Sequence, residues 1–221
     1  MPRFRRLVVP GYPHHVTQRG VRRQQTFFDA RDYRTYLDLA AEELEKVDLR
    51  ISAYCLMPNH VHAIVIPDDR QSLSKFFANV HHRYAMKINA RKGWAGHLWQ
   101  ERFYSVVMDE THLLMGMRYV ELNPVRSGLC RRPQDWPWSS ARAHLDECLD
   151  PLVHDVSPFE LIDDWSAYLS DGDDEERLRE IRDQTRTGRP SGRDTFIDDI
   201  EARSGRTVRR NPGGRPKKLG H

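Results

Sequence analysis

The hydrophobic positions of the chain follow two different periods between residues 14 and 122. Segments that alternate, or that are continuously apolar and β-branched, predict strands. Such segments are residues 14–18, 51–57, 61–66 and 103–108. Segments with apolar side chains at helical spacing are residues 29–47, 73–90 and 110–122. Asp109 or Thr111 can cap the last of these helices, and Asn123-Pro124 ends it.

The predicted order is strand, helix, strand, strand, helix, strand, helix. Its first six elements are those of the split βαβ, ferredoxin-like arrangement. We therefore expect an α+β fold with a four-stranded antiparallel sheet and helices on one face. The other face, or an edge of the sheet, is expected to be free for a ligand. A further helix and a C-terminal extension follow this unit.

Composition narrows the class of protein. The chain has 221 residues, of which 38% are hydrophobic, and a mean hydropathy of −0.74, so we expect part of it to stay solvated. No apolar run approaches 18 residues, which argues against a membrane span, and the basic N-terminus lacks the apolar region of a secretory signal. The three cysteines, Cys55, Cys130 and Cys148, form no CxxC pair and indicate reduced thiols in a cytoplasmic protein.

The formal net charge of +3 conceals strong segregation along the chain. Residues 1–28 contain six arginines and no acid, and residues 201–221 contain seven Lys and Arg against one Glu. Residues 146–176 contain 12 Asp and Glu and no Lys or Arg. The pattern favours basic surfaces for a polyanion, with an acidic stretch that is either a solvated spacer or a shield over a DNA groove. The predicted division is a domain at 1–145, an acidic linker at 146–184 and a basic, flexible tail at 185–221.

Two histidines separated by one residue form the first candidate site. Side chains alternate along a strand, so His60 and His62 point to the same side, roughly 7 Å apart along the chain, while Val61 points into the core. Two converging imidazoles can bind a divalent metal through neutral nitrogens. The alternative is that these are two exposed, unconnected histidines.

The last predicted helix offers partners for this pair. Tyr119 and Asn123 are four residues apart and so share one helical face. The amide oxygen of Asn123 could complete a metal site, and Tyr119 beside it would be a plausible nucleophile. The alternatives are that Tyr119 is a packing aromatic and that Asn123 is fitted to precede Pro124.

These residues lie in ordered segments that resemble the motifs of the single-tyrosine HUH transposases, and in particular the REP-associated tyrosine transposases. The segments are Leu56–His62, Trp99–Tyr104, Tyr119–Leu129 and Trp136–Ser140. The resemblance covers roughly residues 3–145. It implies a ferredoxin-like catalytic domain that cuts and rejoins single-stranded DNA, expected here to be hairpin-forming DNA.

The resemblance also implies roles for individual residues. His60 and His62 fall on the metal-ligand histidines of the family, for Mg²⁺ or Mn²⁺, and Tyr119 falls on its nucleophile. Asn123 falls where family members place a polar third ligand, often the longer Gln. Attack by Tyr119 would give a 5′-phosphotyrosine and a free 3′-hydroxyl, and another 3′-hydroxyl could reseal the strand without ATP.

Substrate DNA would be held by arginines on its phosphates. The expected ones are Arg3, Arg5, Arg6, Arg19, Arg22 and Arg23, with Arg215 as an AT-hook-type contact in a narrow minor groove. The aromatic side chains of Trp94, Trp99 and Tyr104 either stack on unpaired bases or pack in the core. The adjacent pairs His14-His15 and His81-His82 are expected to be structural, because neighbouring side chains do not point the same way.

Two other functions remain open at this stage. One is a DNA-hairpin-binding regulator that keeps the transposase fold without cutting. The other is a metal-dependent hydrolase that acts through water and forms no covalent adduct. The sequence also leaves open whether the protein is a monomer or a homodimer.

Overall fold

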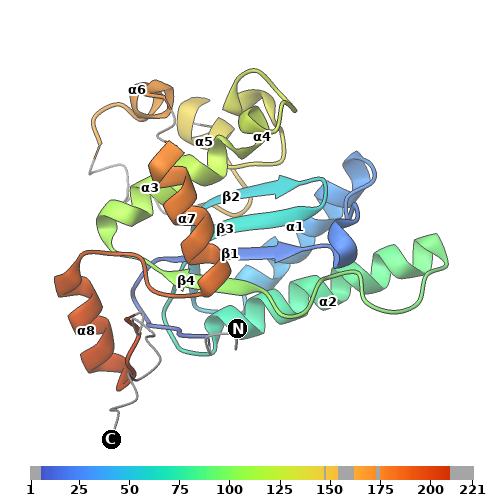
Figure 1. Cartoon of the computed structure of the whole chain (residues 1–221). Helices are drawn as coiled ribbons and strands as arrows, with labels where there is room; N and C mark the ends of the chain where they lie inside the picture. Colours follow the sequence, from blue (N-terminus) through green and yellow to red (C-terminus); the bar gives the residue numbers. More distant parts are fainter. Residues whose placement is uncertain (1–5, 147, 154–161, 173–174, 210–221) are drawn as a thin grey trace, which may run out of the picture.

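A four-stranded antiparallel sheet forms the centre of the computed structural model, which describes residues 6–146, 148–153, 162–172 and 175–209 (Figure 1). The strands lie in the order β2-β3-β1-β4. Their bounds are β1 His14–Arg19, β2 Leu49–Met57, β3 His60–Pro67 and β4 Tyr104–Val107. β1 pairs antiparallel with both β3 and β4, and β2 pairs antiparallel with β3. This is the order expected for two interleaved βαβ units, so the predicted ferredoxin-like fold is confirmed.

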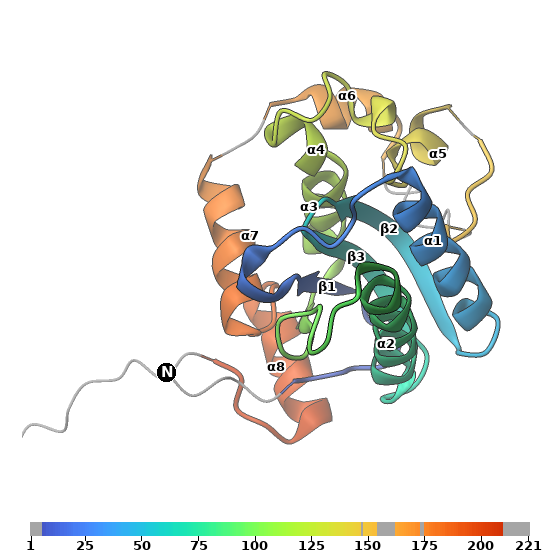
Figure 2. The ribbon, with the colours of Figure 1, turned by 90° about the vertical axis from the view of Figure 1, so that its right-hand side faces the viewer.

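Helices α1 (Ala30–Leu44) and α2 (Ser72–Lys92) cover one face of the sheet (Figure 2). Each is the crossover of one βαβ unit. Asp29 caps α1 by accepting hydrogen bonds from the backbone N–H groups of Arg31 and Asp32. Gly93 ends α2 with a φ of 64°, a left-handed conformation that a glycine adopts without strain.

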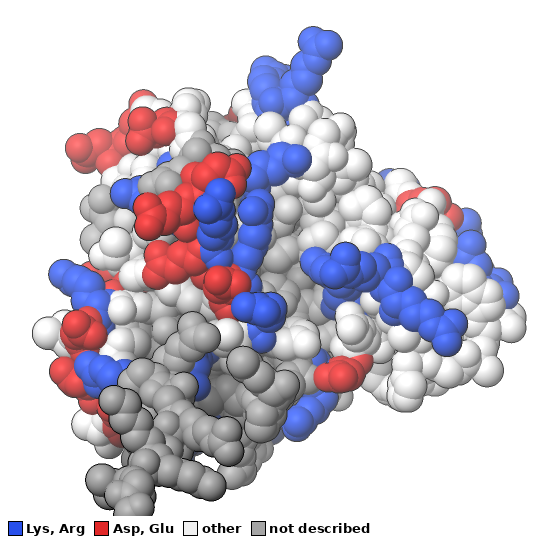
Figure 3. Space-filling view, in the orientation of Figure 1, with Lys and Arg blue, Asp and Glu red and all other residues white. Residues whose placement is uncertain are grey.

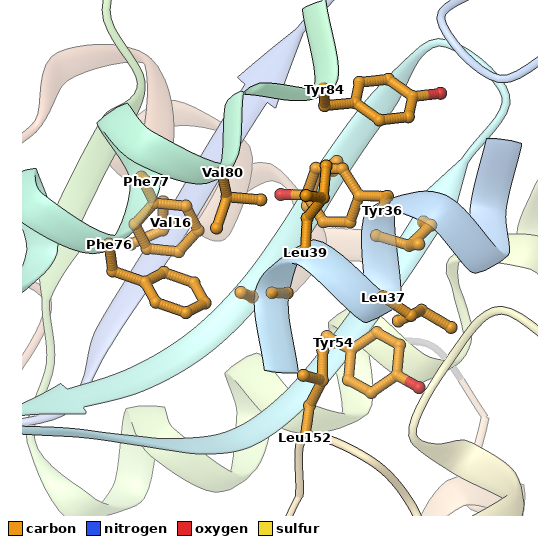
Figure 4. Close-up of a cluster of buried hydrophobic side chains, with 14 of the residues drawn as sticks. Val16, Tyr36, Leu37, Leu39, Tyr54, Phe76, Phe77, Val80, Tyr84 and Leu152 are labelled. Atoms are coloured by element: carbon orange, nitrogen blue, oxygen red, sulfur yellow. The ribbon is translucent and has the colours of Figure 1, made fainter. Parts of the chain in front are cut away.

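The main hydrophobic core lies between these two helices and the sheet (Figure 4). Val61, Ala63 and Val65 of β3 point into it, as the alternation of the sequence predicted. Phe76, Phe77, Val80 and Tyr84 of α2 meet Tyr36, Leu37 and Leu39 of α1 above them. The even-numbered residues of β3 therefore face the opposite side of the sheet.

That opposite side is covered, so the expectation of a free sheet face is wrong. Helix α3 (Glu110–Glu121) packs on β2 and β3, and α7 (Glu175–Thr187) packs on β4. Both lie on the face away from α1 and α2 (Figure 2). A Cβ at Gly116 would lie 3.2 Å from the Cδ1 atom of Ile64, so the glycine lets α3 approach β3 closely. This close packing places the tyrosine-bearing helix directly over the even-numbered residues of β3.

The described helices of the C-terminal third also pack against the domain. Helix α6 (Trp165–Ser170) contributes Trp165 and Leu169 to the core beneath α3, and α8 (Asp194–Ser204) packs with the N-terminal segment through Ile200. The remaining short helices are α4 (Asn123–Arg126), α5 (Ala141–Asp146), η1 (Val21–Arg23) and η2 (Pro133–Asp135). The predicted boundary at residue 184 falls inside α7, and the described residues 185–209 are folded, in contrast to the expected flexible tail. Within this charged segment, the buried apolar residues Ile200 and Val208 pack the chain against the domain.

No helix in the described segments is long and apolar enough to cross a membrane. The three cysteines are free thiols: Cys55 is buried, Cys130 is half-buried and Cys148 is exposed.

Candidate active site

His60 and His62 are the first and third residues of β3 and face the side of the sheet that α3 covers. Their ring centroids are 4.8 Å apart, so the two imidazoles meet as the alternation of a strand requires. His62 is 5% exposed, and His60 is half-buried at the strand's beginning. The alternative of two exposed, unconnected histidines does not describe this geometry.

Asn59 fixes the ring of His60. Its Oδ1 atom lies 2.6 Å from Nδ1 of His60, and its Nδ2 atom donates to the carbonyl of Arg23 at 3.0 Å. Because the amide nitrogen is engaged with a carbonyl, the amide oxygen must accept from an N–H on His60 Nδ1. The lone pair of His60 then lies on Nε2, the nitrogen left for a metal.

His15, on the neighbouring strand β1, contacts His62. Its Nε2 atom lies 2.9 Å from Nδ1 of His62, and the two rings stack at a centroid distance of 5.2 Å. The sequence expectation that His15 is structural holds in that it is buried at 2% exposure, but the side chain contacts the site directly. The alternation of β1 against β3, in which His15 pairs with Ile64, is the signal that could have indicated this contact.

Burial keeps these imidazoles neutral. Desolvation lowers the pKa of His60 to about 3, with a smaller contribution from the Arg19 charge. Desolvation also lowers the pKa of His62 well below its usual value, with smaller contributions from His60 and His15 and from the arginines Arg19 and Arg126. Neutral imidazole is the form that binds metal ions, so both rings are ready to act as ligands.

Tyr119 stands above the histidines on α3. Its ring centroid is 5.7 Å from that of His62 and 5.9 Å from that of His15, in edge-on contacts. The guanidinium of Arg126 lies 4.5 Å from the centre of the Tyr119 ring and donates to the Tyr119 carbonyl. A cation beside the ring suits a reaction in which the tyrosine meets a phosphate. Arg126 was part of the recognised motif, but the sequence alone gave it no role.

Asn123 lies one helical turn beyond Tyr119. Helix α3 ends before Leu122, and Asn123 is the first residue of the short helix α4. Because Leu122 keeps αR geometry, the side chains of Tyr119 and Asn123 retain their i and i+4 relationship. Asn123 is 8% exposed, and its side-chain Nδ2 atom has no hydrogen-bond partner. The unpartnered atom is the amide nitrogen, which donates hydrogen bonds and does not bind metals, so a role for Asn123 as a ligand would fall to its Oδ1 atom. In the described residues no group of three His, Cys, Asp or Glu could hold a metal, so a metal at His60 and His62 would need a ligand of another kind, such as the amide oxygen of Asn123.

Glu121 anchors the C-terminal end of the tyrosine-bearing helix α3. It is fully buried, and its carboxylate accepts hydrogen bonds from Ser140 Oγ at 2.7 Å and Trp165 Nε1 at 2.9 Å, with His144 Nδ1 as a third partner. Ser140 belongs to the Trp136–Ser140 motif, which thus locks the end of α3 to the sheet. Glu121 lies between the two site residues of α3 and α4 and sets their position.

Three of the predicted DNA-binding arginines lie in the segment that pairs with or contacts the beginning of β3. Arg19 is exposed at the end of β1 opposite His60, and Arg22 and Arg23 are exposed in η1 with φ of 54° and 61°. A Cβ on Gly20 would lie 2.3 Å from the carbonyl oxygen of Gln24, so the loop closes tightly on itself. Two consecutive non-glycine residues in the left-handed region store strain of the kind found at functional sites. In the view of Figure 3, a row of Lys and Arg lies to the right of α7, whereas most Asp and Glu lie over α6 and α7, where Lys and Arg also stand beside them.

The other predicted DNA contacts have different outcomes. Arg6 donates to the Phe103 carbonyl at 2.8 Å and stacks on the Phe103 ring, away from the histidines. Arg3, Arg5 and Arg215 lie outside the described residues. Trp99 is 8% exposed, and its Nε1 donates to the His81 carbonyl, so it is a core residue and not a stacking platform. Trp94 is 43% exposed, and Tyr104 is half-buried.

Comparisons with known proteins agree with this architecture. The family model for IS200-like transposases matches residues 9–123. A Haemophilus influenzae protein named for the REP-associated tyrosine transposases is 25% identical over 99 residues, which cover 40% of this chain and 56% of that protein. An Escherichia coli REP-associated tyrosine transposase is 21% identical over 129 residues, which cover 58% of this chain and 69% of that protein.

A solved structure of a REP-associated tyrosine transposase bound to a REP hairpin superimposes with a TM-score of 0.57 at 19% identity. The match covers 76% of this chain and 96% of that one. At this identity the likeness establishes the fold. The family model, which spans the strands, the histidine pair and the tyrosine helix, establishes the membership. The chain belongs to the family of IS200-like transposases.

Proposed function

We propose that this protein cleaves and rejoins single-stranded, hairpin-forming DNA through a covalent 5′-phosphotyrosine at Tyr119. The observation that carries the proposal is the meeting of three side chains. His60 and His62 lie 4.8 Å apart, and the Tyr119 ring lies 5.7 Å from His62. A protein that only binds DNA needs neither a prepared ligand pair nor a tyrosine beside it.

The residues divide the chemistry between them. His60 and His62, with Asn123, would hold a divalent ion such as Mg²⁺ or Mn²⁺, which when bound acts as a Lewis acid and a template for the scissile phosphate. Tyr119 attacks the phosphorus with its hydroxyl oxygen and loses the hydroxyl proton, and the bond to the 3′-oxygen breaks, so that this oxygen takes up a proton and leaves as a 3′-hydroxyl. Arg19 and Arg126 offset the charge of the phosphate as it approaches the buried histidines. Rejoining is the reverse attack by a 3′-hydroxyl.

A second basic surface could hold the stem of the hairpin. Residues 6–10 meet the end of α8 at a hollow lined by arginines from three parts of the chain. These are Arg6, Arg70, Arg203 and Arg206. The hollow adjoins the end of β3 opposite to the end that carries His60. Seven strand residues, or roughly 23 Å, separate the two ends. About seven base pairs at about 3.4 Å span that distance, so one stem could reach both ends of the sheet.

The test is a covalent-adduct assay on the full chain. A hairpin oligonucleotide with single-stranded flanks is incubated with protein and Mn²⁺ and run on a denaturing gel. The polarity of the reaction predicts that a 3′-end label stays with the protein and a 5′-end label leaves as free DNA. Tyr119→Phe must give no adduct, whereas Tyr12→Phe, at a half-buried tyrosine bonded to Asp199 on α8, must behave as wild type.

The same assay separates the two competing functions. A DNA-binding regulator would retard the hairpin on a native gel but leave it intact. A metal-dependent hydrolase would cut it without any labelled protein, and Tyr119→Phe would still cut. Either result would contradict the proposal.

A further inference from the structure

We propose that His15 is a positioning residue for the metal site, and that Thr185 of α7 completes its hydrogen-bond chain. The proposal rests on the proposed role of His62 as a metal ligand. It goes further by assigning a function to a strand β1 histidine and to a helix that lies beyond the residues matched by the family model.

The chain of contacts runs from α7 to the histidine pair. The Thr185 hydroxyl lies 2.7 Å from the carbonyl of Ile181 and 3.3 Å from Nδ1 of His15. Nε2 of His15 lies 2.9 Å from Nδ1 of His62. Each link joins two side chains from different elements, except the first, which lies within α7.

Only one arrangement of protons satisfies every link when His62 is a ligand. The Thr185 hydroxyl donates to the Ile181 carbonyl, because a carbonyl can only accept. The hydroxyl oxygen then accepts from Nδ1–H of His15, which leaves Nε2 of His15 as an acceptor. His62 donates to it from Nδ1, and the lone pair of His62 must lie on Nε2, where a metal can bind. Through its hydrogen bond with His15, the Thr185 hydroxyl on α7 thus selects the tautomer of the ligand His62.

Burial makes this series of hydrogen bonds effective in holding the His62 ring. His15 and His62 are 2% and 5% exposed, so water cannot readily replace either partner. The two rings lie nearly parallel, at an interplanar angle of 17°, which also fixes the orientation of the His62 ring. His15 directs its only available lone pair at His62 and therefore positions the ligand without binding the metal itself.

The test measures metal affinity directly. Mn²⁺ is titrated into the full chain by isothermal calorimetry, without DNA, so the readout does not depend on activity. His15→Phe keeps a flat ring and removes the acceptor, and we expect it to weaken Mn²⁺ binding by about 10- to 100-fold, the usual effect of losing such a partner. His15→Gln restores an acceptor near the position of Nε2, and we expect it to recover most of the affinity.

His14 provides the matched control. It is the adjacent histidine, it is fully buried, and it contacts the Tyr12 carbonyl and the Val9 backbone N–H instead of the site. His14→Phe should leave the Mn²⁺ affinity of the folded protein unchanged. If His15→Phe does not fold, the half-buried Thr185 supplies the test: Thr185→Val should weaken Mn²⁺ binding severalfold, and Thr185→Ser should not.

The outcomes distinguish this inference from the proposed function. Wild-type binding that is weakened by His15→Phe or Thr185→Val and restored by His15→Gln or Thr185→Ser supports it. Equal Mn²⁺ affinity in wild type and in the folded Phe and Val variants overturns it and leaves the metal site intact. Absence of Mn²⁺ binding in wild type overturns the metal site itself, and the role of His15 with it.

Discussion

The side chains of Asn59 and His60 are joined at 2.6 Å between Oδ1 and Nδ1, and Asn59 is held in turn by the carbonyl of Arg23. The backbone of Asn59 also accepts from Gly20 at 2.9 Å. One residue thus ties the first histidine to the strained arginine loop η1. In the proposed function, this one turn would set both the orientation of the His60 ligand and the position of the DNA-binding arginines.

Asn59→Leu should weaken Mn²⁺ binding, because His60 would be free to rotate and to change tautomer. We expect a loss of about 10-fold in affinity, at the lower end of the range for such partners, since His60 is only half-buried. Calorimetric titration of Mn²⁺ measures it. Asn89→Leu removes an asparagine that bonds to the Gly96 carbonyl and serves as the control. Unchanged affinity in Asn59→Leu would show that the amide does not orient the ring.

Glu121→Leu should destabilise the protein by about 3 kcal/mol, because it removes the buried acceptor of the hydrogen bonds from Ser140 and Trp165. Urea unfolding followed by tryptophan fluorescence measures the loss. Asp38→Leu, at an exposed carboxylate on α1, should change the stability by less than about 0.5 kcal/mol. Similar stabilities for the two variants would refute the role of Glu121 as an anchor of α3.

Stability should fall as the solution becomes acidic, even without metal. Burial lowers the pKa of His14 to about 4 and that of His81 to about 3, whereas an unfolded histidine titrates near 6.5. Below pH 6.5 the unfolded chain therefore binds more protons than the native one, and each such histidine costs about 1.4 kcal/mol between pH 7.5 and 5.5. Urea unfolding in EDTA at these pH values measures the slope.

A matched variant identifies the source of this slope. His14→Phe removes one of the titrating groups, so the loss of stability between pH 7.5 and 5.5 should shrink by about 1.4 kcal/mol. A wild-type stability that is constant or rises toward pH 5.5 would contradict the assignment of neutral, buried histidines.

The arginines of η1 should govern the salt dependence of hairpin binding. Replacing both Arg22 and Arg23 with Gln removes two exposed charges beside the site. The slope of log K against log salt should become shallower by about 0.7 to 0.9 for each lost phosphate contact. Fluorescence anisotropy with a labelled hairpin measures it. Arg142→Gln, at an exposed arginine paired with Asp146, should leave the slope unchanged. Equal slopes in the two variants would place the DNA elsewhere.

The sequence predicted the parts of the site that depend on local periodicity. Alternation along β3 placed His60 beside His62, and the four-residue spacing on a helix placed Asn123 one turn beyond Tyr119. It did not reveal His15, because its contact with His62 depends on how β1 and β3 pair over a separation of 47 residues. Nor did the sequence reveal α7, since Leu178 and Ile181 are sparse apolar positions in a highly charged stretch, and they become buried only when α7 packs on the sheet at β4.

Peptide mapping tests most directly whether Tyr119 becomes covalently bound to DNA. The protein is incubated with the hairpin and Mn²⁺, the DNA is trimmed by nuclease, and the tryptic peptides are analysed by mass spectrometry. We predict a nucleotide joined through its 5′-phosphate to Tyr119, in the peptide between Arg118 and Arg126. Cleaved hairpin with an unmodified Tyr119, or with the nucleotide on another residue, would contradict the account.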